Sequence, residues 1–171
     1  HLDVAFEKPM EPTSSVQLAL PAPVSPLSPA VSNDVWAGVR AALAKARRPV
    51  LAVGRTVGDV SAVVEGWGGP VVTDVFASQQ PSAVAPLPNT LFASGALDDA
   101  DVVLQLGGSF VSKDFQLWKQ RTQAQWWRID AHARVGSVVC EENVVRCNPT
   151  LWPPLALPVM DVDWVRDVDA Q

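Results

Sequence analysis

The chain has 171 residues, of which 48% are hydrophobic and 18% are charged. This length and composition suit a domain with a substantial hydrophobic core and exclude a wholly disordered chain. The net charge of −5 argues against a nucleic-acid-binding protein, which would carry a basic surface. Because neither a membrane-spanning run nor a signal peptide is visible in the sequence, we expect no membrane insertion and a cytoplasmic location.

Residues 1–30 differ in composition from the rest of the chain, because they hold six of its fifteen prolines. Proline removes a backbone donor and disfavours helix in the residue before it, so this stretch is predicted to be extended. The opening, residues 1–6, alternates like an edge strand and is typical of a segment cut from a longer chain. We therefore expect an interdomain linker over residues 1–30 and a Rossmann-like α/β domain over residues 31–171.

Hydrophobic periodicity after residue 31 predicts helices that alternate with short buried strands. The predicted helices cover residues 33–48, 59–67, 112–124 and 161–170, and the predicted strands cover residues 50–54, 70–75, 101–108, 126–130 and 143–147. The polar stretch over residues 77–96 is predicted to be a long loop with one helical turn. In the last helix, Val162, Val165 and Val168 are expected to face inward. This order predicts a doubly wound, mostly parallel sheet of five or six strands with helices on both faces.

Two strands end in glycine, which raises the question of a nucleotide site. The dinucleotide fingerprint requires Gly-x-Gly-x-x-Gly, whereas the first turn reads Gly54-Arg55-Thr56-Val57-Gly58 and the second offers only Gly107 and Gly108. A P-loop is also absent from the sequence. We interpret these glycines as residues that let the chain turn, with nucleotide binding as the alternative.

Other residues of catalytic or metal-binding types do not form a recognisable constellation. His132 is far in sequence from His1, and Cys140 and Cys147 are seven apart, which favours a buried reduced pair over zinc or a disulfide. No Gly-x-Ser-x-Gly elbow marks a nucleophile. The sequence thus predicts no catalytic, cofactor-binding or metal-binding residue within this chain.

Lys113 is better placed than any other cation, because it follows the loop at the carboxyl end of the third predicted strand. A lysine at the start of a helix adds to the positive end of the helix dipole and suits an anionic ligand. The alternative is a solvated surface lysine. Asp114 beside it reads as an ordinary acid in the first turn of a helix.

A family resemblance is carried by residues 101–118, which contain Gln105-Leu106-Gly107, then Ser112-Lys113, and then Phe115-Gln116-Leu117-Trp118. They resemble the middle domain of the 2-succinyl-5-enolpyruvyl-6-hydroxy-3-cyclohexene-1-carboxylate synthases, which show Gln-x-Gly, Ser/Gly-Lys-Arg and Leu-x-x-Trp in this order. Residues 1–10, 48–55 and 126–130 resemble neighbouring segments of the same family. The resemblance therefore runs from residue 1 to about residue 147.

This resemblance implies a transferase, a thiamine diphosphate-dependent carboligase of menaquinone biosynthesis that decarboxylates 2-oxoglutarate and adds the succinyl unit to isochorismate. Thiamine diphosphate and Mg²⁺ would bind to flanking domains of the same chain, and the complete enzyme would be a homo-oligomer. The segment alone would be inactive and would hold no cofactor. By this resemblance Lys113 binds substrate carboxylates, while Asp114 replaces the family's arginine and reverses the charge there.

Two other interpretations are kept. The chain could be the central domain of another thiamine diphosphate enzyme, of the acetolactate synthase type, in which this domain holds a flavin or another nucleotide. It could instead be a non-catalytic interaction module with exposed tryptophans, of which the sequence has seven. The Trp152-Pro153-Pro154 segment departs from the pattern of the synthase family and has no explanation in the sequence.

Overall fold

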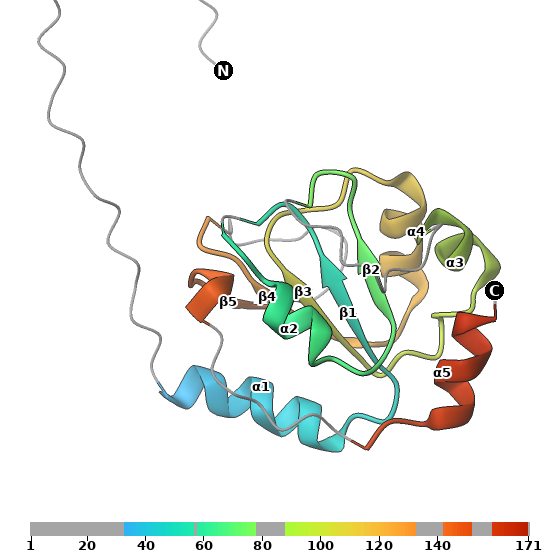
Figure 1. The fold of residues 1–171 in the computed structure, drawn as a ribbon, viewed down its shortest axis with the longest axis horizontal. Helices are drawn as coiled ribbons and strands as arrows, with labels where there is room; N and C mark the ends of the chain where they lie inside the picture. Colours follow the sequence, from blue (N-terminus) through green and yellow to red (C-terminus); the bar gives the residue numbers. More distant parts are fainter. Residues whose placement is uncertain (1–32, 57, 78–87, 133–141, 152–158, 171) are drawn as a thin grey trace, which may run out of the picture.

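A parallel sheet of five strands forms the centre of the computed structural model, in the order β2-β1-β3-β4-β5 (Figure 1). The structure describes residues 33–56, 58–77, 88–132, 142–151 and 159–170. The strands are β1 (Pro49–Val53), β2 (Val71–Thr73), β3 (Val102–Leu106), β4 (Gln125–Ile129) and β5 (Glu142–Val145). The helices are α1 (Asn33–Lys45), α2 (Ser61–Glu65), α3 (Pro88–Ser94), α4 (Lys113–Arg121), α5 (Val162–Asp169) and a 3₁₀ turn, η1 (Pro149–Leu151). The predicted doubly wound α/β fold is confirmed, whereas the predicted linker lies outside the described residues.

Buried apolar strands explain why this sequence forms a sheet that is covered on both faces. Every residue of β1 and β3 is buried, as expected for central parallel strands. Pro49 is tolerated because it is the first residue of its strand. The pairs Val50–Val103 and Leu51–Leu104 bring β1 and β3 into register.

Successive strand residues point to two separate cores. On one face, α1 and α2 cover the sheet with Val39, Leu43 and Val64. On the other face, α3, α4 and α5 cover it with residues that include Phe92 and Trp118 (Figure 1). β1 and β3 therefore lie between two helical layers, and each is followed by a loop before the next helix begins.

Aromatic side chains fill the second core. The rings of Phe110 and Phe115 stack with centroids 3.8 Å apart, and Trp118 is fully buried with its indole N–H donating to the Leu97 carbonyl at 3.1 Å. Five of the seven tryptophans are buried: Trp36, Trp67, Trp118, Trp126 and Trp164. The exposed tryptophan surface expected of an interaction module is therefore not found at these five positions.

Two local expectations were wrong. The stretch predicted as a loop with one turn contains the seven-residue helix α3, because Leu91 and Phe92 bury their side chains in the second core. In α5, Val162 is 75% exposed although the valine spacing predicted it inward. Val168 is buried and Val165 partly buried, as predicted, and Trp164 joins them on the buried face. Val162 lies in the first turn of the helix, which Asp161 caps.

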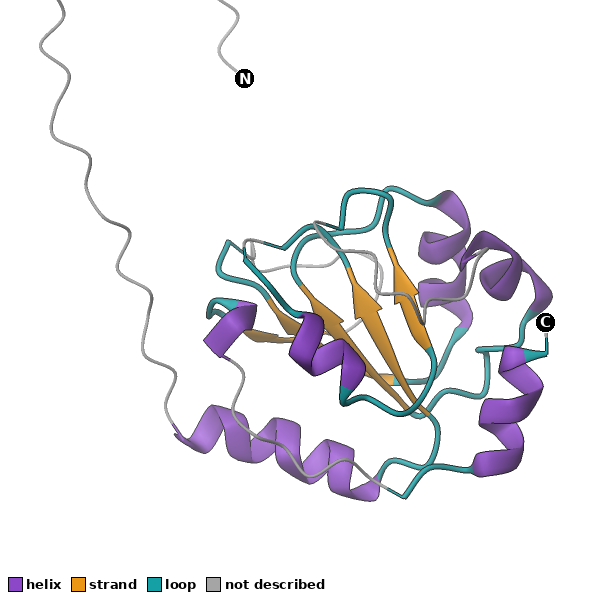
Figure 2. Cartoon of the chain, in the orientation of Figure 1, coloured by secondary structure: helices purple, strands orange, loops and turns teal. Residues whose placement is uncertain are grey.

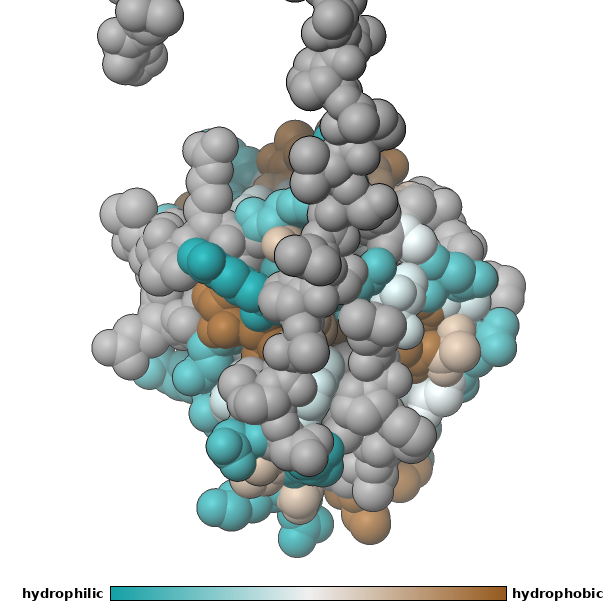
Figure 3. All heavy atoms as spheres, turned by 90° about the vertical axis from the view of Figure 1, so that its left-hand side faces the viewer, coloured by the Kyte–Doolittle hydropathy of each residue, from teal (hydrophilic) through white to brown (hydrophobic). Residues whose placement is uncertain are grey.

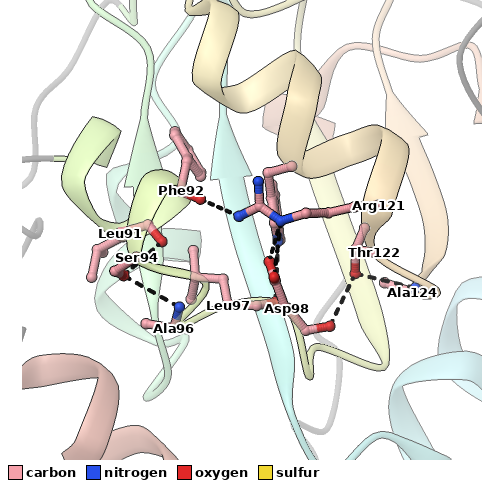
Figure 4. Close-up of polar contacts among 10 residues, drawn as sticks. Leu91, Phe92, Ser94, Ala96, Leu97, Asp98, Arg121, Thr122 and Ala124 are labelled. Atoms are coloured by element: carbon pink, nitrogen blue, oxygen red, sulfur yellow. Dashed lines mark hydrogen bonds and ion pairs between the residues drawn. The ribbon is translucent and has the colours of Figure 1, made fainter.

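Arg121 joins the end of α4 to α3 and its following loop (Figure 4). Its Nε donates to both carboxylate oxygens of Asp98 at 2.9 Å, and its Nη2 donates to the Phe92 carbonyl. Thr122 then ends the helix, with its hydroxyl donating to the Asp98 carbonyl at 3.5 Å. The predicted helix extended to residue 124, and these contacts explain why α4 ends earlier, at Arg121.

The surface of the described part mixes both kinds of residue. Figure 3 shows the side of the molecule where β5 lies, with hydrophobic and hydrophilic side chains next to one another. Within the described ranges, every helix is too short or too polar to cross a membrane.

Candidate functional site

The carboxyl ends of the strands meet at one edge of the sheet, where the arrowheads in Figure 2 point. In an open α/β sheet, ligands bind beyond this edge, at the point where the strand order reverses. Here the order reverses between β1 and β3. The loops that follow these two strands are therefore the first place to look for a site.

These two loops contact each other through their backbones. Gly54 N–H donates to the Leu106 carbonyl and Gly108 N–H donates to the Arg55 carbonyl, both at 2.9 Å. A Cβ on Gly54 would lie 2.1 Å from the Gly108 carbonyl oxygen, and Gly107 has a φ of +81°. In the sequence analysis, these glycines are interpreted as residues that let the chain turn. The structure adds that they also allow the two loops to approach each other closely.

A cavity of about 590 Å³ lies beyond the ends of β1, β3 and β4. Its lining includes Arg55, Arg128, Asp130 and His132. Arg128 is paired with Asp130 at 2.8 Å, and the backbone N–H of His132 donates to the other Asp130 oxygen at 2.9 Å. The lining thus holds two arginines and one aspartate, and the Arg55 side chain is exposed.

Nucleotide binding at the Gly107 and Gly108 turn and a metal at His132 are considered in the sequence analysis, which assigns no site role to Arg55 or Arg128. Arg128 has a usable signal, because it is a charged residue in the otherwise largely apolar strand β4. Arg55 has a second signal, because it directly follows a strand and a glycine. Neither signal shows that both side chains reach the same cavity, since that depends on β3 lying between their strands.

Lys113 is the first residue of α4 and its side chain is exposed. It is not among the residues that line the 590 Å³ cavity, whereas Arg55 and Arg128 are. Ser112 caps α4 by accepting from Phe115 N–H at 3.3 Å. Asp114 lies in the first turn, where an acid is favoured by the helix dipole.

A smaller cavity of about 220 Å³ lies next to Lys113 in sequence, lined in part by Asp74, Asn89, Val111 and Ser112. Asp74 is only 4% exposed. Apart from Asp74, Asn89 and Ser112, this smaller cavity has a mainly apolar surface. Its volume suits a small side chain better than a substrate. We interpret it as packing space beneath the loop that carries Lys113.

Cys147 is buried and reduced. Burial raises the pKa of its thiol from 9.0 to about 11, so the thiol stays protonated and unreactive at neutral pH. Cys140 and His1 lie outside the described residues. Within the ranges that the structure describes, no group of three or more His, Cys, Asp or Glu side chains could hold a metal ion.

The comparison with protein families agrees with the fold. No curated protein matches the sequence. Residues 33–170 match a family described as "Middle domain of thiamine pyrophosphate", and this match covers α1 to α5, including both carboxyl-edge loops. The chain therefore belongs to the family of thiamine pyrophosphate enzyme middle domains.

Proposed function

We propose that this chain is the central domain of a thiamine diphosphate-dependent synthase that decarboxylates 2-oxoglutarate and adds the succinyl unit to isochorismate in menaquinone biosynthesis. Family membership over residues 33–170 supports the coarser part of this proposal, a role in a thiamine diphosphate enzyme. The resemblance of residues 101–118 to the synthase family supports the finer part. The complete enzyme would contain flanking domains, act as a homo-oligomer and work in the cytoplasm.

The observation that carries the proposal is the position of Lys113. It is exposed at the start of α4, directly after the loop at the carboxyl end of β3. A lysine ammonium there can donate charge-assisted hydrogen bonds to a carboxylate brought against this edge. Both proposed substrates carry carboxylates, so one cation at this position has a defined task.

Thiamine diphosphate would supply the electron sink for the decarboxylation when it is bound to the complete enzyme. Thiamine diphosphate and Mg²⁺ would both bind to the flanking domains. This chain would contribute a scaffold and the ammonium group of Lys113, which is the only cation of its motif because Asp114 stands in place of the family's arginine.

The test is Lys113→Ala in the full-length enzyme that carries this segment. Loss of one charge-assisted contact, about 1.5–3 kcal/mol, should raise the KM for 2-oxoglutarate or isochorismate, or lower kcat, by about tenfold to a hundredfold. Because Lys113 is exposed, the Tm should stay within about 1 °C to 2 °C of the wild type. Steady-state kinetics with each substrate varied in turn give the answer.

Two matched variants sharpen this test. Lys113→Arg keeps the charge and should recover part of the lost activity. Lys45→Ala removes another exposed lysine, at the end of α1, and should leave both kinetic constants unchanged. Equal kinetics in Lys113→Ala and Lys45→Ala would show that Lys113 is a surface lysine.

The alternative is a central domain that holds a flavin or another nucleotide. The 590 Å³ cavity favours it, since its volume is typical of a ligand site and Arg55 could face a phosphate. The backbone contact between Gly54 and Gly108 argues against it, because that space is closed to a pyrophosphate. Titration with FAD and with ADP, in wild type and in Arg55→Ala, tests it: micromolar binding that Arg55→Ala weakens would support the nucleotide interpretation.

A further inference from the structure

The loop between β3 and α4, residues 107–112, leads directly into Lys113. Its Val111 side chain is 65% exposed, so burial of that side chain does not hold this part of the loop. The Lys113 side chain is exposed as well. The position of the ammonium group therefore depends on how firmly the backbone before it is fixed.

Polar anchors fix that backbone at several points. Asp74, which directly follows β2, accepts the backbone N–H of Val111 at 2.8 Å and that of Phe76 at 2.9 Å, one on each carboxylate oxygen. The hydroxyl of Ser112 donates to Asn89 of α3 at 2.7 Å. Gln105, itself 2% exposed, donates to the Gly108 carbonyl at 2.8 Å.

Asp74 joins the end of β2 to the loop that carries Lys113. It is 4% exposed, and a buried carboxylate that accepts two backbone N–H groups makes charge-assisted hydrogen bonds, which are stronger than neutral ones. Val111 is two residues before Lys113, so a shift of its N–H would move the first turn of α4. The Arg121 contacts hold the other end of this helix, so both ends of α4 are anchored and the Asp74 contact is at the end that carries Lys113.

We infer that Asp74 is a positioning residue that acts through Lys113: it fixes the β3–α4 loop so that the lysine meets a substrate carboxylate. This inference rests on the proposed function for the role of the lysine, but the anchoring of the loop stands independently of it. Asp74 itself does not touch substrate in this inference. Its effect on catalysis should disappear when Lys113 is removed.

Asp74→Asn tests this inference in the full-length enzyme. The amide keeps the shape but turns an N–H group toward a backbone N–H, so one of the two anchors is lost. We expect the KM for the carboxylate substrate to rise about threefold to tenfold with kcat largely retained. Hydrogen exchange of the amides of residues 109–113 should become faster.

Asp101→Asn is the matched control. Asp101 also accepts two backbone N–H groups, from Arg47 at 2.6 Å and from Arg48 at 3.1 Å, but it does so at the opposite edge of the sheet. It should lower the Tm as Asp74→Asn does, and it should change neither the KM nor the exchange of residues 109–113. If Asp74→Asn fails to fold, Asn89→Ala removes an exposed anchor of the same loop and should raise the KM in the same direction.

The double variant Asp74→Asn/Lys113→Ala decides whether the two residues act together. We expect it to have the same KM as Lys113→Ala alone, within about twofold. A further rise in KM by the full factor of the single variant would overturn the inference, as would unchanged KM and exchange in Asp74→Asn. If Lys113→Ala alone has wild-type kinetics, the proposed function fails, while faster exchange in Asp74→Asn would still establish the anchoring.

Discussion

At both the amino and the carboxyl edge of the sheet, an aspartate accepts two backbone N–H groups. At the amino edge, Asp101 holds the backbone N–H groups of Arg47 and Arg48, and the Arg48 side chain pairs with Asp99 and Asp161 at 3.3 and 3.2 Å. At the carboxyl edge, Asp74 holds the backbone of Val111 and Phe76. In both places a carboxylate links two loops that are far apart in sequence through hydrogen bonds.

The surroundings of the two anchors differ. At the amino edge Arg48 is paired with two carboxylates and Val162 is 75% exposed. At the carboxyl edge Arg128 is paired with Asp130, whereas Lys113 is exposed, as are Val75, Phe76 and Val111. The two edges thus share one kind of backbone anchor, and only at the carboxyl edge does this anchor precede a residue with a proposed role, Lys113.

The largest expected effect is on the carboxyl edge. Gly54→Ala would place a Cβ 2.1 Å from a backbone oxygen, which only a shift of the loop can relieve, so we expect a loss of about 3 kcal/mol in the free energy of unfolding. Gly68→Ala is the matched control on the loop before β2: it has a φ of +70° and open space, and should cost about 1 kcal/mol. Urea unfolding of both variants measures the difference, and equal losses would contradict the tight loop contact.

A smaller effect is expected in alkali, near the end of β5. Because burial raises the pKa of Cys147 to about 11 in the folded state, its thiol ionises first in the unfolded state, and stability should fall as the pH rises from 9 toward 11. Cys147→Ala removes this dependence, so its deficit relative to wild type should shrink between pH 8 and pH 10.5. A deficit that is constant over this range would show that the thiol does not titrate as its burial requires.

The smallest effect is expected in acid, at the amino edge. The backbone N–H of Trp164, which donates to the Asp161 carboxylate, and the side chain of Arg48 lower the pKa of Asp161. A lowered pKa stabilises the fold above about pH 4, and the contribution is lost as the pH falls through the folded-state value. The difference in urea midpoint between wild type and Asp161→Asn should therefore be larger at pH 7 than at pH 3, with the exposed Asp167→Asn as control. The opposite order would contradict a stabilising role for this cap.

Most of the fold follows from the sequence, because buried parallel strands such as Val50–Val53 are apolar runs bounded by proline and glycine. The cap at Ser112 was also predictable, since a hydroxyl before an amphipathic stretch is a local signal. Helix α3 was not, because Leu91 and Phe92 are stabilised by a core that forms only when α4 packs on them. Tertiary contacts here override a polar, proline-rich local sequence.

The site was predictable only in part. Lys113 stands at a strand end in the sequence, so its location on the carboxyl edge could be inferred, although its role stays a proposal. The sequence pattern places Asp74 within a strand, and nothing local indicates that its carboxylate reaches a loop 37 residues later. Likewise, the shared cavity of Arg55 and Arg128 depends on strand order, which periodicity alone does not specify.

The backbone contact between Gly54 and Gly108 makes the two carboxyl-edge loops a single mechanical unit. A displacement of the Arg55 loop must carry the neighbouring peptide along, and with it the segment that ends in a lysine. Mutagenesis that aims to change what this edge binds should vary Arg55 and Lys113 but keep Gly54 and Gly107, because a Cβ at these positions would lie 2.1 Å and 2.4 Å from a backbone oxygen of the other loop.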